Sequence, residues 1–139
     1  MITTVAVGTD GSATAAAALE MAADLARRFD AQLVLLSAFD SSKASRKPTD
    51  PEGEWSYNPA SRMQEILDRA REDLARDGLD VSTRIDDGEP AEVLVRLAEE
   101  CEADVLVVGN KGMKRRVLGS VPNTVTHRAG CSVMVVKTT

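Results

Sequence analysis

Apolar and polar residues follow two different rhythms along this chain. Four short runs are almost continuously apolar, which is typical of strands buried in a parallel sheet. They lie at residues 3–8, 32–39, 105–108 and 131–137. A fifth run, at residues 79–85, alternates apolar with polar residues and therefore predicts an edge strand.

Between these runs, apolar residues recur at intervals of three or four, as on the inner face of a helix. The first helix is predicted from an N-cap at Ser12 to Asp30, with an alanine-rich inner face that ends at Phe29. A polar stretch at residues 40–59 predicts a long surface loop. The second helix follows this loop and is closed by Gly78, a residue type favoured at helix C-termini.

Two further helices are predicted in the C-terminal part of the chain. A turn at residues 86–88 leads into a helix that opens at Pro90 and whose inner face reaches Cys101. Ser120 is the predicted N-cap of the last helix. Cys101 and Cys131 fall within apolar patterns, so we expect buried free thiols and no disulfide framework.

Strands that alternate with helices at short spacing predict βαβ units, a parallel sheet and right-handed crossovers. With 139 residues and 43% hydrophobic content, the chain is long enough for one substantial core and too short for two. We therefore predict a single α/β domain over residues 1–139, built on an open five-stranded parallel sheet with helices on both faces.

Charge and hydropathy narrow the set of partners. The net charge is −5, and the acidic residues are spread along the helices, which argues against nucleic acid as a partner. No apolar run approaches the roughly 18 residues typical of a membrane span, and the N-terminus lacks the features of a signal peptide. The expectation is a cytoplasmic protein that does not contact a membrane.

The stretch with the clearest chemistry follows the apolar run at residues 105–108. Gly109, Gly112 and Gly119 punctuate a loop, and glycine lets the backbone approach a ligand closely. Ser120 then begins a helix, whose free amides and positive dipole end attract anions. The basic residues of the loop are Lys111, Lys114, Arg115 and Arg116. Together these features predict a phosphate site.

Three motifs together carry a family resemblance. They are Gly8-Thr9-Asp10-Gly11-Ser12, Gly88-Glu89-Pro90, and Gly109-x2-Gly112-x6-Gly119-Ser120. In this combination the chain resembles the universal stress protein family over essentially its whole length. The resemblance implies a sheet of strand order 3-2-1-4-5, a homodimer formed through the last strand and, in many members, an ATP site.

By this resemblance, one group of residues meets the base and ribose of an adenine nucleotide, and a second wraps the ribose and phosphates. The first group is Gly8, Thr9, Asp10 and the backbone around Ala38. The second is Val108, Gly109, Lys111, Gly112, Gly119, Ser120 and Val121. The physical argument agrees, because a 3-2-1-4-5 sheet reverses order between strands one and four, where ligands bind at the carboxyl ends. Asp10 would hold a ribose hydroxyl or an Mg²⁺ that accompanies the phosphates.

The glycine motif departs from the family pattern in one respect. Six residues, 113–118, separate Gly112 from Gly119 here, where the ATP-binding members have nine. A shorter loop offers fewer amides to the β- and γ-phosphates. We therefore expect weak, salt-sensitive binding of ATP and a smaller loss for AMP or cyclic AMP, which carry a single phosphate.

The closing apolar run predicts how the protein assembles. Val133, Met134, Val135 and Val136 would leave a bare apolar edge at the end of the sheet, which is an aggregation hazard. A two-fold contact through this strand would hide the edge on both copies. The alternative is a monomer whose preceding helix and C-terminal tail, residues 137–139, shield it.

Several enzyme classes do not fit the sequence. It contains no P-loop motif and no Gly-x-Ser-x-Gly elbow, and its single histidine rules out a Cys/His zinc cluster. A receiver domain like that of a response regulator would use Asp10 as the metal-binding acid, Asp86 or Asp87 as the phosphoacceptor and Lys137 as the cation. Its phosphoacceptor should end a central strand, whereas residues 79–85 predict an edge strand.

Three functions remain open at this point. They are an ATP-binding stress or signalling module, a cyclic AMP-binding module and a nucleotide-free dimeric scaffold. No general base accompanies the phosphate loop in the sequence, so we expect a binding protein with no catalytic residue and at most slow ATP hydrolysis.

Overall fold

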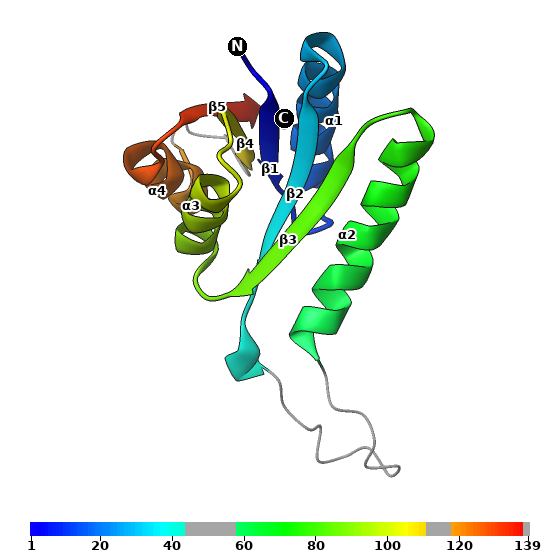
Figure 1. The fold of residues 1–139 in the computed structure, drawn as a ribbon. Coiled ribbons are helices and arrows are strands. Elements are labelled where there is room, and N and C mark those ends of the chain that lie inside the picture. The colour runs from blue at the N-terminus through cyan, green and yellow to red at the C-terminus, as the bar shows by residue number, and fades with distance from the viewer. Residues whose placement is uncertain (44–57, 111–117, 138–139) are drawn as a thin grey trace.

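The computed structural model describes residues 1–43, 58–110 and 118–137. Within these ranges five strands form one sheet in the order β3-β2-β1-β4-β5, and every pairing is parallel (Figure 1). The strands are β1 (Thr4–Gly8), β2 (Gln32–Phe39), β3 (Val81–Asp87), β4 (Val105–Asn110) and β5 (Ser132–Lys137). This sheet confirms the predicted α/β class, the strand order and the edge position of β3.

Helices cover both faces of the sheet, as Figure 1 shows. On one face α1 (Ala13–Phe29) and α2 (Pro59–Arg76) pack over the odd-numbered core residues of β1, such as Val5 and Val7. On the other face α3 (Pro90–Glu100) and α4 (Ser120–Arg128) pack over Ala6 and its neighbours in the adjacent strands. A short 3₁₀ turn, η1 (Ser41–Lys43), follows β2. The two apolar layers therefore place β1 at the centre of the fold.

The small residues on α1 let this helix lie close to the sheet. Ala18, Ala22 and Ala26 are fully buried at intervals of four residues, and alanine combines high helix propensity with little bulk. Phe29, which we predicted on the same inner face, is instead 49% exposed. It occupies the last helical position, next to the C-cap Asp30, where the backbone turns into the left-handed region.

The end of β3 and the start of α4 are two of the element boundaries that differ from the sequence prediction. β3 continues through Asp86 and Asp87, which we had assigned to a turn, because both pair in register with the end of β2. The N-cap of α4 is Gly119 rather than Ser120, and Ser120 is the first helical residue. Capping patterns place a helix start only to within one or two residues, and here no side chain caps the helix.

The amino end of β1 is fixed by a carboxylate from the loop before β4. Oδ2 of Asp104 accepts hydrogen bonds from the backbone N–H groups of Thr3 and Thr4, at 2.8 and 2.9 Å. These amides hold the pKa of Asp104 below its ordinary value of 3.8. Since the folded state lowers this pKa, the ionised carboxylate stabilises the fold, and that contribution is lost as the pH falls through the folded-state pKa.

We therefore expect Asp104→Ala to lower the melting temperature at neutral pH, because two strand-end amides lose their acceptor. The difference from the wild type should begin to shrink below about pH 3.8 and should vanish as the pH falls through the lower folded-state pKa, where the wild-type carboxylate becomes protonated. Thermal denaturation across this pH range measures both effects. Asp104→Asn keeps an acceptor and should lose less, whereas a pH-independent difference for Asp104→Ala would contradict the assignment.

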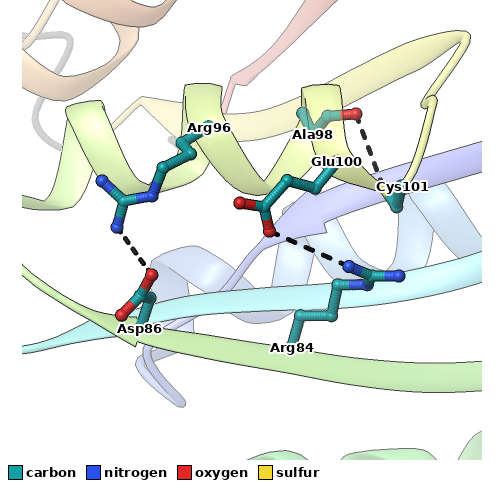
Figure 2. A network of polar contacts seen from close by, with 6 residues as sticks. All are labelled: Arg84, Asp86, Arg96, Ala98, Glu100 and Cys101. Carbon is teal, nitrogen blue, oxygen red and sulfur yellow. Dashed lines mark hydrogen bonds and ion pairs between the residues drawn. The ribbon is translucent and has the colours of Figure 1, made fainter.

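Polar contacts tie α3 to the edge strand β3 (Figure 2). A guanidinium nitrogen of Arg96 lies 2.8 Å from a carboxylate oxygen of Asp86, and Arg84 lies 3.9 Å from Glu100. These side chains are about half exposed, so each pair contributes little to stability. Cys101 donates a weak hydrogen bond to the carbonyl of Ala98, and burial raises the pKa of its thiol.

Both cysteines are free, as we expected, but they are half-buried rather than fully buried. Burial raises the pKa of Cys131 as it does that of Cys101. In the part of the chain that the structure describes, no helix combines the length and the apolar character needed to cross a bilayer.

Candidate functional site

A cavity of about 450 Å³ opens at the carboxyl ends of β1 and β4, where the strand order of the sheet reverses. Its size lies in the range of small-molecule sites. It is lined by Gly8, Thr9, Asp10, Ser12, Thr14, Ala15, Ser37, Ala38, Pro90, Leu94, Val108, Gly109, Gly119, Ser120, Val121 and Pro122. Because each helix follows a parallel strand, the first turns of α1, α3 and α4 all meet here.

The loop after β1 is fixed by its own hydrogen bonds. The N–H of Thr9 donates to the carbonyl of Leu36 at 2.9 Å, which continues the β1–β2 ladder by one residue. Gly11 then adopts a φ of +81°, a conformation that favours glycine. Oδ1 of Asp10 accepts from the N–H of Ser12 at 2.9 Å, so the exposed carboxylate is held at the cavity rim.

One wall of the cavity is apolar. Leu94, on α3, packs against the backbone of Gly8: a Cβ at position 8 would lie 2.8 Å from Cδ1 of Leu94. Val108 and Ala38 continue this surface from the ends of β4 and β2. The wall is suited to the flat, largely apolar ring of a base or a similar heterocycle.

Another part of the lining presents unpaired helix amides. Ser12 caps α1, and Glu89 caps α3 by accepting from two backbone N–H groups, but no side chain caps α4. Asn123 donates the first intrahelical bond of α4, to Gly119, and Pro122 has no N–H. The amides of Ser120 and Val121 are therefore the donors that the first turn of α4 offers to an anion.

Every predicted site residue within the described ranges lies on this cavity: Gly8, Thr9, Asp10, Ala38, Val108, Gly109, Gly119, Ser120 and Val121. The two others, Lys111 and Gly112, lie outside the described residues, as do Lys114, Arg115 and Arg116. The structure thus brings together segments separated by up to about a hundred positions in the sequence.

The sequence did not single out several other lining residues. Leu94 falls within the helix predicted to open at Pro90 and to end its inner face at Cys101, and both Leu94 and Pro90 also line the cavity. Ser37 lies directly before the predicted Ala38 and is only 3% exposed, and a polar residue inside an apolar strand was a signal that could have marked it.

The described lining of the cavity carries little formal charge. Among the described residues that line the cavity, Asp10 alone carries an ionisable side chain. Asp86 and Asp87, at the end of β3, lie outside the lining, and each accepts hydrogen bonds from nearby residues. The N–H of Asp87 and then Arg96 hold the pKa of Asp86 low, and the hydroxyl and N–H of Ser41 do the same for the pKa of Asp87.

The fold and cavity together define an α/β protein with a cavity at the switch point of its sheet. A model of the Universal stress protein family matches residues 1–137. The chain therefore belongs to the universal stress protein family.

Universal stress proteins of other organisms are similar to this chain over nearly its whole length. Universal stress protein Rv1636 of Mycobacterium tuberculosis is 39% identical over 142 residues, which cover 98% of this chain and 97% of that protein. Universal stress protein MJ0531 of Methanocaldococcus jannaschii is 32% identical, with 96% of this chain and 81% of that protein covered.

Among solved structures, a universal stress protein in complex with cAMP superposes with a TM-score of 0.75 at 33% identity. The match covers 99% of this chain and 98% of that one. The universal stress protein UspA from Lactobacillus plantarum gives a TM-score of 0.77 at 28% identity, with 97% of each chain covered.

Proposed function

We propose that this chain binds an adenine nucleotide in the switch-point cavity and acts as a stress-response or signalling module. The observation that supports this most is that one cavity is lined both by an apolar wall, at Gly8 and Leu94, and by residues with unpaired amides, Ser120 and Val121. An apolar surface suits the base, and helix-terminal amides suit a phosphate. Nucleotide binding in the family, seen in the cAMP complex, agrees with this assignment.

Among adenine nucleotides, we propose that those with a single phosphate fit best. The structural neighbour at 33% identity holds cAMP, which makes cyclic AMP a specific alternative to ATP. The described anion-binding wall offers only two unpaired amides, and the sequence between Gly112 and Gly119 is short. Both features favour one phosphate group over three.

An Mg²⁺ ion would fit the site only as a companion of the phosphates. In the described residues no group of three or more acidic, histidine or cysteine side chains could hold a metal by itself. On the lining that the structure describes, Asp10 is the one carboxylate, and one of its oxygens already accepts from Ser12. A single carboxylate together with substrate phosphates is a common way to bind Mg²⁺, which would neutralise phosphate charge there.

We propose a binding protein rather than an enzyme. A hydrolase needs a group that orients or deprotonates water beside the phosphate, and Asp10 is the sole ionisable candidate on the described lining. Slow hydrolysis of ATP remains the alternative. The proposed location is the cytoplasm.

We propose further that the protein is a homodimer through β5. This edge strand pairs only with β4 among the described strands, and Val133, Met134 and Val135 stay partly exposed along it. A two-fold contact would cover them on both copies. A nucleotide-free dimeric scaffold is the alternative function that this surface would support if the cavity binds no nucleotide.

Calorimetric titration with ATP, AMP and cyclic AMP at two ionic strengths tests the proposed function. We expect AMP and cyclic AMP to bind more tightly than ATP. Affinity for ATP should fall most with salt. Its additional phosphates would depend on lysine and arginine side chains, whose attraction salt screens, rather than on hydrogen bonds from backbone amides. Tight ATP binding that is insensitive to salt would contradict the single-phosphate preference, and the absence of binding by all three would favour the scaffold.

A further inference from the structure

The last residue of β4, Asn110, is hydrogen-bonded to Gly119, the residue that precedes α4. Asn110 is fully buried, and its Oδ1 accepts a hydrogen bond from the N–H of Gly119 at 2.9 Å. The two residues are nine positions apart and stand on either side of the loop. The contact therefore joins the end of a central strand to the N-cap of α4.

This hydrogen bond fixes where the first turn of α4 sits. The next two amides after Gly119 are those of Ser120 and Val121, which line the cavity. Since the Gly119 N–H is already bonded to Asn110, it is not a donor to the ligand. A Cβ at position 119 would lie 3.3 Å from Oδ1 of Asn110, so glycine also provides the room that this contact needs.

We propose that Asn110 is a positioning residue that sets the α4 amides to receive a ligand phosphate. The inference rests on the proposed function. A buried side chain held in a single place is suited to this task, since anion binding by backbone amides depends on their alignment. Asn110 acts through Gly119 and α4 and does not touch the ligand itself.

The choice of an amide over a carboxylate follows from the same geometry. An aspartate at this position could still accept a hydrogen bond from the N–H of Gly119. It would, however, place a negative charge in a fully buried position next to the amides proposed to bind the phosphate. A buried unpaired charge is costly, and this one would also repel a phosphate. The neutral amide supplies the acceptor without the repulsion.

The test compares AMP with adenosine, which lacks the phosphate, in calorimetric titrations of the full chain. Asn110→Ala removes the acceptor, and Asn110→Asp keeps an acceptor but adds charge. We expect both variants to bind AMP about tenfold more weakly or worse, while adenosine binding changes less than about twofold. Asp104→Ala is the matched control, because it weakens the fold at the opposite end of the strands and should leave the affinity for AMP unchanged.

The possible outcomes separate the two levels of the proposal. If the wild type binds AMP and the Asn110 variants lose AMP and adenosine equally, or lose neither, the positioning role is wrong. If the wild type binds neither compound, the proposed function is wrong, and the role of Asn110 falls with it. Should both variants fail to fold, hydrogen exchange of the Gly119 amide is measured in the wild type. We expect this amide to be protected from exchange, and we expect AMP, but not adenosine, to change its exchange rate. An unprotected amide would overturn the inference.

Discussion

Replacing Ser120 with proline should weaken binding of AMP and cyclic AMP by at least about tenfold while leaving the fold intact. The variant removes one of the two unpaired amides in the first turn of α4. A hydrogen bond to a charged group contributes roughly 1.5–3 kcal/mol, which corresponds to about 10- to 150-fold in affinity. Calorimetry with the two nucleotides measures the loss.

The substitution suits this position structurally. Ser120 is the first helical residue, where proline is favoured because its N–H has no intrahelical partner. Gly119 has φ −62° and ψ 170°, an extended conformation that a residue before proline accepts readily. Ser120→Ala is the matched control, since it removes the hydroxyl and keeps the amide. Equal losses in the two variants would show that the amide is not the binding group.

A charge in the middle of β5 should convert the proposed dimer into a monomer. Val135 lies on the edge strand β5, pairs with Val108 of β4 and is partly buried. In a two-fold contact, Val135→Asp would bury a charge without a partner on each copy, at a cost of several kcal/mol. We expect the dissociation constant to rise by about a hundredfold or more, as measured by light scattering and sedimentation across protein concentrations.

Ser82→Asp provides the control for this prediction. It places the same charge on an exposed residue of β3, the strand at the other edge of the sheet. This variant should keep the wild-type assembly state. A wild type that is monomeric at tens of micromolar would contradict the dimer and would favour the alternative of a monomer whose preceding helix and C-terminal tail shield the edge of the sheet.

The edge position of β3 could be predicted because burial on two faces and burial on one face leave different sequence patterns. β4 has four consecutive aliphatic residues, all buried, whereas β3 alternates and lies at the edge. The cavity could be located as well, since the strand order places the carboxyl ends of β1 and β4 side by side.

Other features depend on contacts that no local pattern encodes. Asn110, from another element, accepts a hydrogen bond from the amide of Gly119, the N-cap of α4. Leu94 follows the spacing of a core residue, and its contact with Gly8 appears only when α3 lies over β1. β3 extends through Asp86 and Asp87 because β2 offers partners there, which overrides the turn preference of these residues.

The most direct test of nucleotide binding at this cavity is a two-dimensional amide NMR titration of the wild type with AMP. The predicted result is a saturable shift of the amides around Thr9, Gly109, Ser120 and Val121, with no change at Asp80 on the opposite end of the sheet. Shifts confined to that opposite end, or none at millimolar AMP, would contradict it.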